Sequence, residues 1–298
     1  AASSRETFLL ANNLLLTASA AMILLGTLYP LLAEALDLGK ISVGPPYFGM
    51  LFVLLMAPLV LLLPFGPLVR WQREDISQPL RWLAPWAALA AAVGVIAFFA
   101  WPQGTAKTAV GMAGAVWLLA GTARFVWQRL RSPGSRFTAE MVGMLFAHAG
   151  LAVFVAGVFI TDSTSIERDV AARAGDRFEL RGYDFAFDGV EKHPGPNYLA
   201  DRGTVRVFRD GEPVAVLHPE KRAYKAGGQV MTEAALDGAV SRDLYVALGE
   251  PLDQTGGWAL RLYVKPYVRL IWLGALMMAL GGFMVAFDKR FRRPVAAP

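Results

Sequence analysis

The sequence of 298 residues contains no cysteine and only three histidines. The missing sulfur excludes a disulfide scaffold, a thiol redox enzyme and a cysteine-ligated zinc or iron–sulfur centre. Charged residues are also scarce, at 18% compared with about 25% in typical globular chains. Apolar residues make up 55% of the chain, which excludes a disordered tail, because such tails lack the apolar surface needed to fold.

The shortage of charge is confined to two blocks. Residues 1–160 and 266–287 alternate long apolar runs with short basic segments, whereas residues 161–265 have the composition of an ordinary polar domain. The polar block holds 14 basic and 17 acidic residues, and the rest of the chain holds 15 basic and 7 acidic residues. The basic excess therefore belongs to the apolar part, and no nucleic-acid partner is expected.

The apolar runs are long enough for transmembrane helices, which need about 20 predominantly apolar residues each. Pro30 is expected to kink the first run or to end its apolar section, and three prolines weaken the second. The sequence opens directly onto a full-length span, so no cleavable signal peptide is expected. The predicted spans are residues 8–36, 48–69, 80–101, 108–127, 139–160 and 267–287.

The connectors between these runs predict the orientation, because short cytoplasmic loops are enriched in lysine and arginine. The second and fourth connectors and the tail are rich in basic residues, namely Arg70, Arg73, Arg81, Arg124, Arg129, Arg131, Arg136, Lys289, Arg290, Arg292 and Arg293. The first and third carry only Lys40 and Lys107. In a bacterium this predicts a multi-pass inner (plasma) membrane protein whose residues 161–265 lie in the periplasm.

The polar block shows the period-2 alternation of β-strands, with turn residues between the strands. Apolar residues alternate with charged ones around Phe185, Val205 and Leu262, and Leu244, Val246 and Leu248 predict one more strand. Asp210-Gly211 predicts a tight hairpin, and Asp188-Gly189 and Asp237-Gly238 predict further turns. The predicted fold is thus a polytopic α-helical membrane protein of about six helices with an inserted small antiparallel β domain, either a sheet or a barrel. Its parts are residues 1–160 (five helices), 161–265 (β domain) and 266–298 (final helix and basic tail).

His148 is the most informative candidate site residue. It lies about nine residues, or roughly 13 Å, into the fifth span, near the middle of a core about 30 Å thick. No Asp, Glu, Lys or Arg occurs between Met141 and Ile160, and ionisable groups inside membranes suggest function. A stripe of small residues (Gly143, Ala147, Gly150, Gly157) borders it and permits close approach of a helix or a flat ligand. The imidazole could bind a metal, relay protons, or bond to a neighbouring helix.

The other polar candidates are weaker. His193 lies in a segment with loop composition, and His218 ends the second strand of the Asp210-Gly211 hairpin. Neither has a second histidine or a carboxylate at ligand spacing, so both are expected to be ordinary surface residues. Asn12 and Asn13 lie in the first span, where they could bond between helices, and a role in packing is expected of them.

Several segments of the chain resemble the C-terminal half of CcmF, the haem lyase family of bacterial cytochrome c maturation, which includes the NrfE type. They follow the family order over nearly the whole chain. The most specific is Gly143-Met144-Leu145-Phe146-Ala147-His148-Ala149-Gly150. The others are residues 4–6, 12–15, 26–31, 40–48, 231–235, 242–250 and 265–272.

The resemblance implies a membrane-embedded b-type haem held by two histidines on different helices, of which the later is His148. It also implies partners: a haem chaperone, an apocytochrome c with its thiol-handling subunits, and the N-terminal half of the same protein or a split partner. In the family, haem is joined through thioether bonds to the apocytochrome, and the b haem supplies electrons that keep the incoming iron reduced.

The chain also departs from the family pattern. The Trp-rich haem-handling segment, its two flanking outer histidines and the other membrane histidine are absent from the sequence. His148 can give one axial ligand, so the second must come from the missing half or a partner chain. The expected function is one part of a haem lyase, incomplete alone, with no catalytic residue assigned. The alternatives are a non-catalytic membrane scaffold that docks maturation partners and, third, a transporter or channel subunit.

Overall fold

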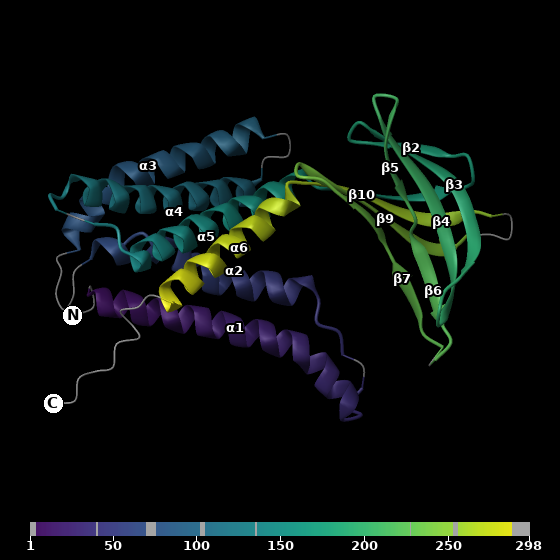
Figure 1. Ribbon diagram of the computed structural model, residues 1–298, viewed down its shortest axis with the longest axis horizontal. Coiled ribbons are helices and arrows are strands. Elements are labelled where there is room, and N and C mark those ends of the chain that lie inside the picture. Colours follow the sequence, from purple (N-terminus) through teal and green to yellow (C-terminus); the bar gives the residue numbers. More distant parts are fainter. Residues whose placement is uncertain are drawn as a thin grey trace. The chain divides into compact units, whose positions relative to one another are not determined.

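The computed structural model describes residues 4–39, 41–69, 76–101, 105–134, 136–226, 228–252 and 256–287. The chain divides into two compact units. The first consists of Ala1–Ala156 with Leu273–Pro298, and the second of Gly157–Trp272. The first is helical; the second contains all the strands together with the adjoining ends of two helices (Figure 1).

Six helices in the described part of the chain are long and apolar enough to cross a membrane. This confirms the predicted number of spans. Two helices begin earlier than predicted because hydroxyl side chains cap them: Ser4 accepts from the Thr7 amide and Thr105 from the Thr108 amide, each at 3.3 Å. The helices are α1 (Arg5–Ala35), α2 (Pro45–Leu62), α3 (Ser77–Ala100), α4 (Ala106–Arg131), α5 (Ala139–Thr164) and α6 (Val268–Ala286).

The prolines act differently in the first two helices. Helix α1 continues through Pro30 to Ala35, and Figure 1 shows it bending toward that end, so Pro30 does not end the helix. Helix α2 stops at Leu62, before Pro64, and a short 3₁₀ helix, η1 (Gly66–Leu68), follows. The interruption agrees with the weakness expected of the second span.

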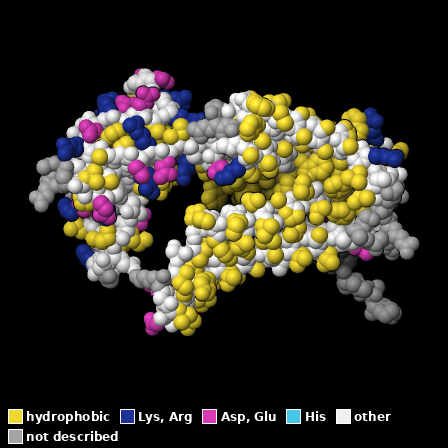
Figure 2. All heavy atoms as spheres, turned by 180° about the vertical axis from the view of Figure 1, so that it is seen from behind, with side chains coloured by type: hydrophobic (Ala, Val, Ile, Leu, Met, Phe, Trp, Pro, Cys, Tyr) yellow, Lys and Arg dark blue, Asp and Glu magenta, His cyan; other side chains and the backbone are white. Residues whose placement is uncertain are grey.

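Apolar side chains cover much of the outer surface of the helical unit (Figure 2). Leu10 is 69% exposed and Phe99 is 80% exposed. Such exposure is abnormal for a soluble protein and is expected where lipid replaces water. Several residues used to predict the orientation lie outside the described residues, namely Lys40, Arg70, Arg73, Lys289, Arg290, Arg292 and Arg293.

The strands form a sandwich of two antiparallel sheets, which confirms the antiparallel β domain but is neither the single sheet nor the barrel that was predicted. One sheet has the order β1-β10-β9-β8, and the other has the order β2-β3-β4-β6-β7 with β5 paired to β4. The strands are β1 (Ile166–Ala172), β2 (Arg177–Leu180), β3 (Tyr183–Pro194), β4 (Tyr198–Arg209), β5 (Glu212–Leu217), β6 (Glu220–Tyr224), β7 (Val230–Glu233), β8 (Ala235–Gly238), β9 (Arg242–Pro251) and β10 (Trp258–Pro266).

The alternation seen in the sequence accounts for the core. Phe185, Phe187 and Val205 from one sheet pack in the same core cluster as Leu244 and Leu262 from the other, and all are at most 1% exposed. Arg206 and Arg261, which directly follow Val205 and precede Leu262, are exposed, as period 2 requires. Ala186, between the two buried phenylalanines, is an exception and is 4% exposed.

One of the three predicted turns is found at its predicted residues. Asp210 (φ 53°) and Gly211 (φ 84°) form the two-residue connection between β4 and β5, with the positive φ values of a type I′ hairpin. The prediction for Asp237-Gly238 was displaced: both residues pair with β9 at the end of β8, and residues 239–241 form the connection. The prediction for Asp188-Gly189 was wrong: these residues lie inside β3 at a bulge, where the register shifts and Gly189 takes φ 118°.

Within the second unit, hydrogen bonds tie the helix ends to the sandwich. The Thr161 hydroxyl donates to the Pro266 carbonyl at 3.1 Å, and the Tyr267 amide donates to the Ser241 carbonyl at 3.1 Å. The Arg181 guanidinium donates to the carbonyl of Thr164, near the end of α5. These bonds satisfy backbone groups where the chain changes from helix to strand.

Candidate functional site

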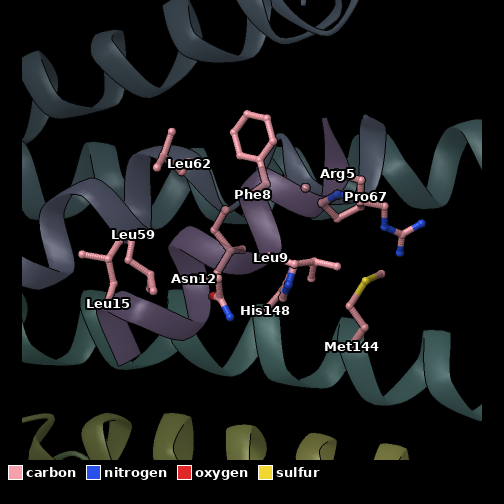
Figure 3. A pocket seen from close by; sticks show the side chains of 12 residues that line it. Arg5, Phe8, Leu9, Asn12, Leu15, Leu59, Leu62, Pro67, Met144 and His148 are labelled. Carbon is pink, nitrogen blue, oxygen red and sulfur yellow. The ribbon is translucent and has the colours of Figure 1, made fainter. Parts of the chain in front are cut away.

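His148 is the tenth residue of α5, about 14 Å from the start of the helix at 1.5 Å per residue. Its side chain is half-buried and lines a pocket of about 160 Å³ in the helical unit. The pocket lies between α1, the end of α2 with η1, and α5 (Figure 3). Its lining residues are Arg5, Phe8, Leu9, Asn12, Leu15, Leu59, Leu62, Leu63, Gly66, Pro67, Met144 and His148.

The pocket is found where α2 is interrupted. Pro64 has no amide hydrogen, and the Phe65 amide bonds to the Leu62 carbonyl at 3.1 Å instead of continuing the α-helical pattern. The Leu61 carbonyl is thereby left to another donor, and the Trp117 indole N–H of α4 reaches it at 3.2 Å. A backbone break at membrane depth is tolerated when such groups are satisfied inside the protein.

The opposite side of α5 is occupied by α6. A Cβ atom added to Gly150 would lie 2.8 Å from the Gly274 carbonyl oxygen, and one added to Gly143 would lie 2.6 Å from the Gly281 carbonyl oxygen. At 3.6 residues per turn, these glycines lie roughly opposite His148. The stripe of small residues therefore admits a helix, the first of the two expected alternatives, and Gly143 and Gly150 lie opposite His148 instead of beside it.

The imidazole has no hydrogen-bond partner within the described ranges, although polar side chains share its pocket. Asn12 enters the pocket from α1, and its amide donates to the neighbouring Asn13 at 3.4 Å. The bond that Asn12 could make to another helix is not seen among the described residues. A half-buried imidazole without a partner can present a nitrogen lone pair to a metal.

The pocket can hold only part of a large ligand. Sites for drug-sized molecules are about 300–1,000 Å³, well above the 160 Å³ found beside His148. Among the described residues, no group of three or more His, Cys, Asp or Glu side chains could hold a metal ion by itself. The pocket residues would fit one wall of a haem site, with His148 as a single ligand to the iron, and the rest of such a site would have to come from other protein.

The other two histidines lie in the sandwich. His193 is in β3, paired with Ala200 of β4, so the expected loop is wrong. Its strand continues to Pro194 because the pairing with β4 outweighs the local composition. His218 directly follows β5, as predicted, and its Nδ1 lies 3.3 Å from the Thr204 hydroxyl.

Ion pairs organise the charged surface of the sandwich. Arg206 donates two hydrogen bonds of 2.7 Å to the Asp188 carboxylate, and this contact holds the pKa of that carboxyl below its ordinary value. Arg261 lowers the pKa of Asp169 in the same way. The buried Glu220 carboxylate accepts from Arg222 at 2.7 Å. These arginines are paired with carboxylates across or along strands, and such pairs stabilise the sheets.

Sequence reasoning missed two of the polar pocket residues. Arg5 was not among the candidate site residues, and Asn12 was assigned only to packing. Met144 and His148 are four residues apart, so their common face on α5 could be read from helical spacing. Nothing in local spacing shows that α1 lies across from that face.

Comparison with known proteins agrees with the architecture. Residues 163–266 match the family described as the CcmF C-terminal beta-sandwich. The chain is 47% identical over 303 residues to the cytochrome c-type biogenesis protein CcmF of Pseudomonas aeruginosa, covering 97% of this chain and 45% of that protein. It is 45% identical over 296 residues to CcmF of Escherichia coli, covering 98% and 45%. The chain thus spans about half the length of these relatives.

A solved structure of a cytochrome c haem lyase CcmF has the same fold. The TM-score is 0.71 at 23% sequence identity, and the match covers 97% of this chain and 46% of the other. Both the helical unit and the sandwich therefore occur together in a protein of this type.

Proposed function

Because this chain belongs to the CcmF family along the part of those proteins that it covers, we propose that it is one portion of a cytochrome c haem lyase, with His148 an axial ligand of a membrane b-type haem. One observation carries the proposal: a half-buried imidazole at membrane depth lines a pocket and has no hydrogen-bond partner within the described residues. Uncompensated polar groups are costly in that environment, and iron would compensate this one.

This chain would contribute positioning rather than the whole reaction. His148 and the apolar side chains of α1 and α2 would bind one face of the macrocycle and keep water from it. Bound there, the haem would supply an electron to the iron of the haem that is being joined by thioether bonds to an apocytochrome c. The second axial ligand would come from the remainder of the family's length, on the same polypeptide or on a partner chain.

The partners and location follow from the same premise. The sandwich would lie in the periplasm of a bacterium and would meet the haem chaperone, the apocytochrome and its thiol-handling subunits. Arg-rich connectors would lie on the cytoplasmic side of the inner membrane; Arg124 and Arg131 of the described residues belong to this set.

The test is spectroscopic. The chain is purified from membranes together with the remainder of the CcmF length, and reduced-minus-oxidised spectra are recorded for the wild type and for His148→Ala. We expect His148→Ala to lose most of the b-type band while the protein accumulates normally, because the imidazole makes no hydrogen bond in the described structure. His218→Ala, which changes an exposed histidine of the sandwich, is the matched control and should keep the band.

A second substitution covers the case in which alanine disturbs folding. His148→Met fills similar space and offers a thioether, and histidine–methionine ligation raises the reduction potential relative to two histidines. A changed spectrum and a higher midpoint potential would support ligation. If both variants keep the wild-type spectrum and potential, His148 is not a ligand.

A second function, that of a non-catalytic scaffold, is favoured by the sandwich. Its core is self-contained, with fourteen buried residues drawn from both sheets, so it could dock maturation partners without any chemistry. A scaffold predicts that His148→Ala still supports cytochrome c assembly in cells, whereas a haem-binding portion predicts that assembly is lost. The described helices offer no comparable observation for a transporter or channel.

A further inference from the structure

Arg5 shares the pocket with His148. Among the described lining residues it is the one with a full positive charge, and its side chain is half-buried at the first turn of α1. All the others apart from Asn12 and His148 are apolar or glycine. A cation and an imidazole therefore face a single, otherwise nearly apolar space.

The backbone of α1 sets how far Arg5 lies from the part of the pocket that contains His148. Arg5 precedes Leu9 by one turn of α1 and Asn12 by two, so it lies roughly 6–10 Å along the helix from the residues nearest the imidazole. Figure 3 shows Arg5 and Met144 at one end of the pocket, Asn12 and His148 in the middle, and Leu15 and Leu59 at the other end. The pocket thus has a charged end, a ligating centre and an apolar end.

This gradient fits an amphipathic, planar ligand with a central metal and acidic groups on one edge. We propose that Arg5 binds the propionate carboxylates of the tetrapyrrole whose iron His148 ligates, an inference that rests on the proposed function. A guanidinium matches a carboxylate with two parallel N–H···O bonds, and such charge-assisted pairs are strongest where water is scarce. The pair would fix which edge of the macrocycle faces the cytoplasmic end of α1.

Neighbouring carboxylates do not prevent this role. Glu140 lies one turn before Met144 on the same face of α5, and Glu6 follows Arg5 on α1. A guanidinium has five N–H donors, so it can pair with a protein carboxylate and a ligand carboxylate together. Such a protein contact would also hold the Arg5 side chain at the pocket.

The experiment measures the contribution of the carboxylates to binding separately from that of the rest of the haem. Haem and haem dimethyl ester, in which both carboxylates are masked, are titrated into the haem-depleted protein purified with the remainder of the CcmF length. We expect the wild type to bind haem about 10–100-fold more tightly than the ester, as one charge-assisted pair implies. Arg5→Gln should weaken haem binding by that factor and leave ester binding unchanged.

Two variants serve as comparisons. Arg131→Gln removes one positive charge at the end of α4, away from the pocket lining, and should change neither affinity. Arg5→Lys keeps the charge without the planar fork and should be intermediate. In Arg5→Gln the midpoint potential should also fall, because the nearby cation favours the less positive reduced iron.

The outcomes distinguish this inference from its premise. If the wild type binds neither compound in a His148-dependent way, the proposed function fails. If it binds haem through His148 but binds the ester equally well, or if Arg5→Gln changes neither affinity nor potential, the assignment of Arg5 is wrong and the proposed function stands. If Arg5→Gln does not fold, the wild-type preference for haem over the ester and the Arg5→Lys data decide.

Discussion

The packing of α5 against α6 gives a sharp test, because two adjacent glycines of α6 differ completely in their surroundings. A Cβ atom at Gly281 would lie 2.4 Å from the Gly143 carbonyl oxygen and 2.7 Å from the Ala147 amide nitrogen. A Cβ atom at Gly282 would have nothing within 4 Å. Gly281→Ala must push the two backbones apart, whereas Gly282→Ala adds a methyl group to open space.

Two effects of opposite sign determine how each substitution changes the free energy of unfolding. Overpacking a well-filled contact costs about 1–3 kcal/mol, and replacing glycine by alanine in a helix interior gains about 1 kcal/mol. Gly281→Ala should therefore lower the free energy of unfolding by up to about 2 kcal/mol. Gly282→Ala should leave it unchanged or raise it by up to about 1 kcal/mol.

The assay is denaturant unfolding in mild detergent, followed by helical circular dichroism. Because the natural chain has no cysteine, a cysteine pair introduced across α5 and α6 would report their separation by cross-linking in each background. Equal stability and equal cross-linking in the two alanine variants would refute the close packing of these helices. A loss of stability in Gly282→Ala but not in Gly281→Ala would show that the other face of α6 makes the close contact with α5.

Two further predictions concern the break in α2 and the charged surface of the sandwich. Trp117→Phe removes the donor to the Leu61 carbonyl and should lower the free energy of unfolding by about 1–3 kcal/mol. Trp272→Phe, on an exposed part of α6, is the control and should change it little. Equal effects of the two substitutions would show that the indole hydrogen bond does not stabilise the break in α2. Arg206 lowers the native pKa of Asp188, so this pair stabilises the fold above about pH 4 and the benefit is lost as pH falls through the native pKa. The stability difference between wild type and Arg206→Ala in a pH series should therefore be largest near neutrality and vanish in acid; a difference that grows in acid would contradict this sign. Arg209→Ala is the control: it loses a hydrogen bond to the Tyr183 hydroxyl at 3.0 Å and only a 3.8 Å pair with the exposed Asp210, so its stability difference should change little over the same pH series.

The number of helices and the inward residues of the sandwich could be predicted because local rules govern them. Spans of about 20 apolar residues have no other stable place than a bilayer or a large core. Alternation in β3 and β9 put Phe185 and Leu244 inside, and a strand slipped by one residue would expose its entire core face. Asp210-Gly211 was predictable for the same reason, since few dipeptides tolerate two positive φ values.

The predictions failed where long-range pairing outweighed local signals. Asp188-Gly189 has the composition of a turn, but pairing of β3 with β4 on both sides turns it into a bulge. His193 similarly belongs to a strand because Ala200 pairs with it. The residue types of a segment permit several backbone conformations, and pairing with a neighbouring strand determines which one forms.

The sequence by itself determined that a lone histidine lies well inside α5, a helix long and apolar enough to span a membrane, because the length and composition of an apolar run can be read without reference to any neighbour. Only the tertiary structure decided what faces it. The glycine stripe is taken by α6, and Arg5 and Asn12 arrive from a helix more than 130 residues earlier in the chain. Periodicity assigns each residue to a side of its own helix, but which helix covers that side depends on packing among all the spans.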